Sequence, residues 1–191
     1  MKATYLKAAS KKSDYPSPDF PEIALTGRSN VGKSSFLNRL TQQKGLARVS
    51  KTPGRTQLIH FFDTDQGFRL VDLPGYGFAK VPEAVRRAWK PMIEDYLQGR
   101  DNLALVICLV DIRHAASAED VDLKAWLDGL GLRTCLVATK SDKLSRNQAN
   151  QRLKELRQQF GVKDGVLAYS SVTGEGRKEV LQLISSCSRQ S

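Results

Sequence analysis

Residue types that bind metals or cross-link small proteins are scarce in this chain of 191 residues. It has 3 Cys and 2 His, and Cys108, Cys135 and Cys187 lie far apart in the sequence. Neither a zinc site nor a disulfide framework is expected from this spacing, so the thiols are interpreted as reduced core residues. His60 and His114 lack the i, i+4 spacing and the neighbouring cysteines of a metal site.

Long apolar stretches are also missing. The longest uninterrupted one, Leu103–Val110, has eight residues, which suits a strand covered on both faces and is too short for a membrane span. Residues Met1–Lys7 carry neither the apolar core nor the cleavage site of a secretory signal. We therefore expect a cytoplasmic protein without a membrane segment, in which residues 1–20, with four Lys and a Pro-rich end, form a loosely ordered arm.

Acidic residues are fewer than basic ones. The chain has 20 Asp and Glu against 30 Lys and Arg, a net charge of +10. Residues 39–55 contain no Asp or Glu, whereas they include Arg39, Lys44, Arg48, Lys51 and Arg55. Such a chain attracts polyanions, and nucleic acid is the commonest large one. Since no aromatic residue interleaves with these charges, contacts to backbone phosphates are favoured over base stacking; the alternative is a solvated basic loop.

The residues that are present alternate between apolar strands and amphipathic helices. The turn composition of Asp65–Gly67 predicts a hairpin, and Pro91 is expected to kink or divide its helix. Strands are predicted over residues 22–26, 58–64, 68–72, 103–110, 134–139 and 166–170, and helices over 34–40, 82–98, 117–130, 145–160 and 175–186. This order predicts an α/β fold: a single domain over residues 21–191, with an open, mostly parallel six-stranded sheet flanked by helices.

One short stretch organises the rest of the chain. Residues Gly27–Ser34, G-R-S-N-V-G-K-S, lie between a predicted strand and a predicted helix and match G-x-x-x-x-G-K-[ST] at every fixed position. Such a loop binds polyphosphate because its backbone N–H groups converge and the helix adds its positive end. Lys33 would reach the β- and γ-phosphates, and the Ser34 hydroxyl would coordinate Mg²⁺. The alternative is an ordinary glycine turn before a helix.

Further polar clusters follow the ends of predicted strands, where ligands bind in open parallel sheets. Asp72 can hold Mg²⁺ through a water molecule opposite Ser34, although an Asp at a strand end can also simply form a turn. Next to it, Pro74 and Gly75 place a backbone N–H with little steric bulk where a γ-phosphate could be sensed.

A guanine-binding pattern follows the strand at 134–139. Thr139-Lys140-Ser141-Asp142 fits [NT]-K-x-D, in which Asp142 accepts two hydrogen bonds from guanine that adenine does not offer. The alternative is a polar loop before a capped helix. Ser170-Ser171 follows the next strand, where a backbone N–H could meet guanine O6. Asp142 counts against an ATP-dependent kinase or ATPase.

These motifs carry a family resemblance. The chain resembles the EngB (YihA/YsxC) family of ribosome-biogenesis GTPases, within the TrmE-Era-EngA-YihA-Septin-like class. The motifs that carry the resemblance are, in this order, G-R-S-N-V-G-K-S-S, K-T-P-G-R-T-Q, D-L-P-G-Y-G, T-K-S-D and Y-S-S. The resemblance covers nearly the whole chain from Glu22 onward. It implies a Ras-like P-loop domain that binds GTP with Mg²⁺, assists assembly of the large ribosomal subunit and is linked to cell division and septation. It also implies that Thr56 is the switch threonine; from the residues alone, Thr52 or Thr56 could serve.

One departure from the Ras pattern concerns hydrolysis. Where Ras-like proteins carry a glutamine that orients the attacking water, this chain has Tyr76, so we expect slow intrinsic hydrolysis. Asn30 resembles the position at which potassium-activated GTPases hold K⁺; otherwise it is a small polar loop residue. Arg55 could act as an arginine finger in cis, although an RNA phosphate contact is favoured.

We therefore predict a monomeric, GTP-controlled assembly factor whose partners are guanine nucleotide and a large-subunit precursor, contacted through rRNA phosphates. The competing hypothesis is an RNA-binding module with a structural guanine nucleotide. Candidate catalytic residues are Lys33, Thr56, Gly75 and Asn30, and candidate Mg²⁺ ligands are Ser34, Thr56 and Asp72. The predicted nucleotide contacts are Gly27, Arg28, Ser29, Asn30, Val31, Gly32, Lys33, Ser34, Gly54, Arg55, Thr56, Gln57, Leu58, Asp72, Leu73, Pro74, Gly75, Thr139, Lys140, Ser141, Asp142, Tyr169, Ser170 and Ser171.

Overall fold

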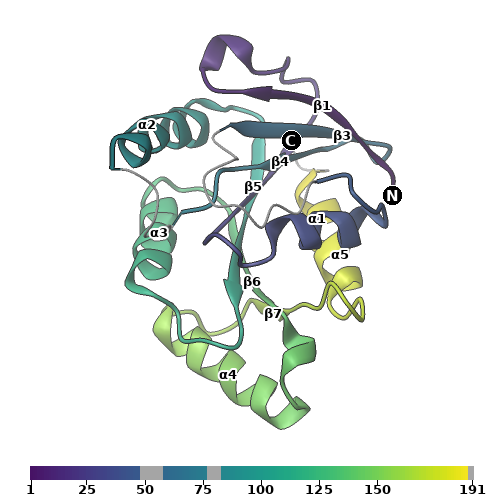
Figure 1. The fold of residues 1–191 in the computed structure, drawn as a ribbon, viewed down its shortest axis with the longest axis vertical. Coiled ribbons are helices and arrows are strands. Elements are labelled where there is room, and N and C mark those ends of the chain that lie inside the picture. Colours follow the sequence, from purple (N-terminus) through teal and green to yellow (C-terminus); the bar gives the residue numbers. More distant parts are fainter. Residues whose placement is uncertain (48–57, 77–82, 189–191) are drawn as a thin grey trace.

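A computed structural model of the chain describes residues 1–47, 58–76 and 83–188. A seven-stranded sheet lies between two groups of helices (Figure 1), so the predicted α/β architecture is confirmed. The strands, in the order β1-β3-β4-β2-β5-β6-β7, are Ala3–Ala9 (β1), Glu22–Gly27 (β2), Ile59–Thr64 (β3), Arg69–Asp72 (β4), Leu103–Asp111 (β5), Thr134–Thr139 (β6) and Val166–Ala168 (β7). The helices are Lys33–Thr41 (α1), Glu83–Gly99 (α2), Ala118–Gly129 (α3), Arg146–Gln159 (α4) and Arg177–Ser188 (α5).

Two apolar layers hold the helices on the sheet. Helices α1 and α5 pack on one face through Phe36 and Ile184, while α2, α3 and α4 cover the other through Tyr96, Leu127 and Leu156. Strand β5 contributes alternate side chains to both layers, as its continuous apolar sequence predicts. From β4 through β7 in the sheet order the strands are parallel, so their carboxyl ends meet at one edge.

Local sequence signals position several of these elements. Ser117 and Asp120 form the capping box that starts α3, and Ser145 with Gln148 forms the one that starts α4, at the predicted beginnings of these helices. The hairpin predicted at Asp65–Gly67 joins the antiparallel strands β3 and β4.

Of the two effects expected of Pro91, a kink or a division, the division does not occur, because α2 runs through this residue. The exposed Pro91 is followed by Met92, Tyr96 and Leu97, which are buried in the core. Their packing outweighs the local cost of a proline in the helix interior.

The sheet has seven strands rather than the predicted six, because residues 1–20 are not the loosely ordered arm that we expected. Ala3–Ala9 form the edge strand β1, which pairs antiparallel with β3 from Ala3 opposite Thr64 to Ala9 opposite Ile59. A bulge lies between Tyr5 and Lys7, and the middle of the strand is exposed. The sequence therefore lacks the clean alternation that marks a strand.

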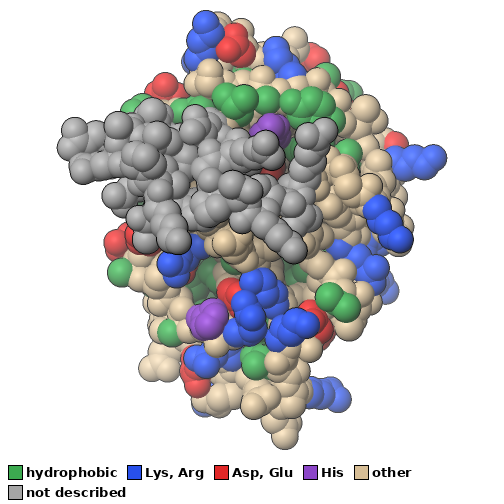
Figure 2. Space-filling view, in the orientation of Figure 1, with side chains coloured by type: hydrophobic (Ala, Val, Ile, Leu, Met, Phe, Trp, Pro, Cys, Tyr) green, Lys and Arg blue, Asp and Glu red, His purple; other side chains and the backbone are tan. Residues whose placement is uncertain are grey.

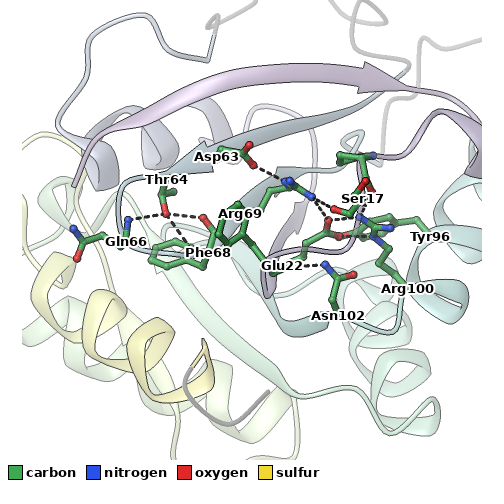
Figure 3. Close-up of polar contacts among 12 residues, drawn as sticks. Ser17, Glu22, Asp63, Thr64, Gln66, Phe68, Arg69, Tyr96, Arg100 and Asn102 are labelled. Atoms are coloured by element: carbon green, nitrogen blue, oxygen red, sulfur yellow. Dashed lines mark hydrogen bonds and ion pairs between the residues drawn. The ribbon is translucent and has the colours of Figure 1, made fainter.

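The segment after β1 is tied to the amino end of the parallel strands by a cluster of buried charges (Figure 3). The Glu22 carboxylate accepts hydrogen bonds from Arg69, Arg100 and the Tyr96 hydroxyl. The two arginines also donate to main-chain carbonyls of the N-terminal segment, Arg69 to Ser17 at 2.8 Å and Arg100 to Pro16 at 2.7 Å. These long-range contacts fix a segment whose own sequence shows no regular pattern.

Candidate nucleotide-binding site

The phosphate-loop sequence connects β2 to α1 at the carboxyl edge of the sheet. Gly27 has a φ angle of 153°, and a side chain there would place its Cβ 2.7 Å from the Leu109 carbonyl oxygen. Gly32 has a φ angle of 111° and is the N-cap of α1, where it offers no side-chain hydrogen bond to the helix. The first turn of α1 is therefore not capped by a protein side chain at its positive end, an arrangement suited to an anion.

Lys33 and Asp72 face one another across this loop. The Asp72 carboxylate is buried at the end of β4, and its Oδ1 atom has no hydrogen-bond partner among the described residues. Burial raises the pKa of Asp72, and the positive charge of Lys33 partly offsets this. Burial also lowers the pKa of Lys33, opposed in turn by Asp72. A buried carboxylate with an unpartnered oxygen, close to a poorly solvated lysine, is typical of a ligand site.

The chain that follows Asp72 runs beside the phosphate loop. Leu73 and Pro74 are buried, and the Leu73 N–H donates to the Leu25 carbonyl at 3.0 Å. Gly75 lies so close to the loop that an added Cβ would be 2.8 Å from Lys33 Nζ and 3.3 Å from the Ser29 nitrogen. A residue larger than glycine would therefore crowd the candidate phosphate position.

The guanine-binding pattern lies at the end of β6, next to the phosphate loop. The Thr139 hydroxyl donates to the Val31 carbonyl at 2.8 Å, and Lys140 Nζ donates to the Asn30 carbonyl at 2.8 Å. Both Lys140 and Asn30 have positive φ angles, of 63° and 62°. The two motifs, more than a hundred residues apart in sequence, are thus joined directly by hydrogen bonds.

Asp142 meets the segment after β7. The Ser170 hydroxyl donates to Asp142 Oδ1 at 2.7 Å, and this hydrogen bond is the main reason that the pKa of Asp142 is lowered. The Ser141 hydroxyl donates to Glu175 at 2.6 Å. Ser170 is thus beside the candidate guanine-binding carboxylate, whereas the Tyr169 side chain is fully buried in the core against Phe36.

Sequence reasoning missed Asp111 at the end of β5. Asp111 accepts hydrogen bonds from Lys140 at 2.7 Å and from Arg113, and so positions the lysine of the guanine pattern. The same strand-end rule that selected Asp72 could have found it. Glu175 and Asp120 were also missed: Glu175 lies in a loop without a motif, and the capping-box position of Asp120 does not indicate its contact with Tyr76.

A cavity of about 280 Å³ lies between the phosphate loop and the loop after β5. Figure 2 shows Lys and Arg side chains gathered on this face, over the region of β6 in Figure 1. Residues that line the cavity include Arg28, Asn30, Asp111, Arg113, His114 and Lys140. The rim of the candidate site is thus rich in cationic groups, which favours anionic ligands.

Four of the predicted contacts, Gly54, Arg55, Thr56 and Gln57, lie outside the described residues, as does Thr52. Leu58, the first described residue after them, is exposed. The predicted phosphate loop, Asp72, Gly75, T-K-S-D and Ser170 therefore meet at one edge of the sheet, while the predicted switch threonine is not among the residues described.

Comparison with known proteins agrees with this geometry. A family model described as "50S ribosome-binding GTPase" matches residues 22–140. "Probable GTP-binding protein EngB" of Syntrophus aciditrophicus is 51% identical over 180 residues, which are 94% of this chain and 92% of that protein. The protein of the same name in Pelotomaculum thermopropionicum is 49% identical over 95% of this chain and 93% of its own length.

The chain belongs to the EngB family of GTP-binding proteins. It is therefore a P-loop GTPase, as its motifs indicated. A solved structure of a probable GTP-binding protein EngB has a similar fold, with a TM-score of 0.75 and 24% identity over 89% of this chain and 100% of that one. Era in complex with MgGDPNP and nucleotides 1506-1542 of 16S ribosomal RNA has a TM-score of 0.70 and 17% identity, covering 88% of this chain and 57% of that chain. No helix among the described residues is long and apolar enough to cross a membrane.

Proposed function

We propose that this GTPase is a switch that assists assembly of the large ribosomal subunit. The observation that carries the proposal is the meeting of the phosphate loop, Asp72, Gly75 and Asp142 at one edge of the sheet, in a chain whose family model is described as ribosome-binding. A site that recognises guanine and senses a third phosphate can couple nucleotide state to partner binding.

In the proposed site, Lys33 holds the phosphates and Ser34, Thr56 and Asp72 hold Mg²⁺, with Asp72 acting through water. The buried, unpartnered Asp72 Oδ1 supports this assignment, because a carboxylate oxygen in that position suits a hard cation. When bound, Mg²⁺ neutralises charge on the phosphate oxygens. Asp142, oriented by Ser170, accepts the guanine N–H groups, and the backbone at Ser170 and Ser171 faces guanine O6.

Hydrolysis in this proposal is slow. Tyr76 replaces the usual glutamine, and its hydroxyl is hydrogen-bonded to Asp120 rather than free to orient a water molecule. Asn30, at the exposed side of the phosphate loop, is the proposed position for a monovalent cation such as K⁺. Equal GTP turnover in Na⁺ and K⁺ salts of the same ionic strength would contradict the role of Asn30.

The proposed partner is a large-subunit precursor, contacted through rRNA phosphates by the basic residues between Arg39 and Arg55. The net charge of +10 supports a polyanionic partner. The fold's similarity to Era, solved with ribosomal RNA, is consistent with this class of ligand. A cytoplasmic location and a monomeric state are further parts of the proposal, and a link to cell division and septation is proposed from the family resemblance alone.

The test is capture of ribosomal particles by the tagged protein loaded with GDPNP or GDP over a salt series. We expect large-subunit precursors to be retained in the GDPNP state and released in the GDP state, with binding that falls steeply as salt rises. Equal capture in both states would contradict the switch and favour an RNA-binding module with a structural nucleotide.

A base-specificity variant makes this test sharper. Asp142→Asn should weaken guanine nucleotide binding about tenfold or more and improve xanthine nucleotide binding, since xanthine offers a carbonyl where guanine has its amine. Capture by this variant should then respond to xanthine triphosphate and not to GDPNP. A response that still follows GDPNP would exclude Asp142 as the base-reading residue.

A further inference from the structure

The main chain around Tyr76 is docked on the phosphate loop. The Ser29 N–H donates to the Tyr76 carbonyl oxygen at 2.9 Å, and Arg28 and Tyr76 form a parallel bridge. This isolated bridge lies beyond the end of the β2–β4 ladder, which stops at Leu25 and Asp72. A backbone N–H of the phosphate loop is therefore bonded to a peptide carbonyl of the segment after β4.

The Tyr76 side chain is anchored separately. Its hydroxyl donates to Asp120 Oδ1 at 2.7 Å, while Asp120 Oδ2 accepts from the Ser117 nitrogen and hydroxyl at the start of α3. Asp120 is 7% exposed, so this charge-assisted hydrogen bond is shielded from water. Burial, with the nearby Asp120 carboxylate, raises the pKa of Tyr76, so the hydroxyl keeps its proton at physiological pH.

These two contacts hold Gly75 against Lys33. Because a Cβ on Gly75 would be 2.8 Å from Lys33 Nζ, little space remains there for a phosphate group between the two residues. Lys33 is the residue expected to reach the β- and γ-phosphates. The docked segment therefore lies where a third phosphate belongs. Neither hydrogen bond involves the first turn of α1, so this anion-binding end of the helix stays open to the phosphates of a diphosphate.

We propose that Tyr76 is a latch that makes the site distinguish the two guanine nucleotides: the latched form holds the diphosphate, and a third phosphate binds only after the Ser29 and Asp120 hydrogen bonds break. The inference rests on the proposed nucleotide site. A ligand that requires a minor conformation binds more weakly by the fraction of protein in that conformation, so the latch lowers affinity for the triphosphate alone.

The test is the affinity of Tyr76→Phe for fluorescent GDP and for a fluorescent, non-hydrolysable GTP analogue. The variant keeps the ring and the carbonyl and loses only the hydroxyl. We expect affinity for the triphosphate analogue to rise about tenfold, through faster association, with affinity for GDP changed less than twofold. No change, an equal change for both nucleotides, or a loss of triphosphate affinity would overturn the latch.

Ser117→Ala is the matched control. It removes a hydrogen bond from the other oxygen of the same carboxylate and leaves the Tyr76 hydroxyl in place. It should lower the melting temperature and leave the ratio of triphosphate to diphosphate affinity unchanged; a shift as large as that of Tyr76→Phe would assign the effect to α3 and overturn the latch. Failure of the folded wild-type protein to bind either nucleotide would instead disprove the nucleotide site itself.

Discussion

Two buried carboxylates lie at opposite ends of neighbouring strands and have opposite surroundings. Glu22 begins β2 and Asp72 ends the parallel strand β4, with exposed fractions of 0% and 7%. Glu22 accepts four hydrogen bonds, two at each carboxylate oxygen. Asp72 has an oxygen without a partner among the described residues.

This difference distinguishes a carboxylate that stabilises the fold, Glu22, from one that belongs to the candidate ligand site, Asp72. A buried charge is costly unless it is paired, so the Glu22 cluster at the amino end is complete within the protein. At the carboxyl end, Asp72 keeps an oxygen without a partner among the described residues, close to the charge of Lys33, and a ligand can complete this site. The number of internal partners of a buried carboxylate thus distinguishes the two roles.

The largest effect on stability is expected at the amino end of the parallel strands, where Glu22 has all its partners within the protein. Glu22→Ala should lower the free energy of unfolding by about 3–5 kcal/mol, because Arg100 would lose its ion pair and the buried Arg69 would keep only Asp63. Urea denaturation of the nucleotide-free protein measures this. Glu155→Gln, which removes a carboxylate from a half-buried surface pair with Arg152, should cost less than about 1 kcal/mol. Equal losses in the two variants would remove the contrast.

Substitution of Asp72, at the carboxyl end of β4, should change stability in the opposite direction. Asp72→Asn is expected to raise the stability of the nucleotide-free protein by about 1 kcal/mol, because it removes a buried charge with an unpaired oxygen. It should also abolish the gain in nucleotide affinity that Mg²⁺ provides over EDTA. Asp164→Asn, at an exposed carboxylate before β7, should change neither quantity. A loss of stability as large as that of Glu22→Ala would show that Asp72 is structural.

The smallest effect concerns Asp111, which lies at the ligand end but is paired. Burial opposes its charge, but hydrogen bonds from Arg113 and Lys140 outweigh this and lower the pKa of Asp111. Its contribution to stability is therefore present above the ordinary Asp pKa of about 3.9 and is lost as the pH falls below that value.

Between neutral and acid pH, Asp111→Asn should therefore lose less unfolding free energy than the wild-type protein does. The difference should be less than about 1 kcal/mol, since the group is partly solvated. Comparison of urea unfolding of the two proteins between about pH 6 and pH 3 measures this. Identical profiles would show that the pairs of Asp111 add no net stability.

The sequence by itself determined the α/β class, the phosphate loop, the beginnings of α3 and α4, the hairpin and the guanine-binding tetrapeptide. These features depend on residues within one or two turns of each other, so local chemistry is sufficient to specify them. Lys33, Asp72 and Asp142 could be assigned candidate roles for the same reason.

Only the tertiary structure decided the rest. Strand β1, the undivided α2, the Glu22 cluster, the Lys140–Asp111 pair and the Tyr76–Asp120 contact all depend on residues that are distant in sequence or on packing against the core. Tyr76 is the clearest case: its neighbours in sequence suggest only a missing glutamine, whereas its partner is 44 residues away at the start of another helix. Burial and partner geometry decide such contacts, and neither is encoded in a short stretch of chain.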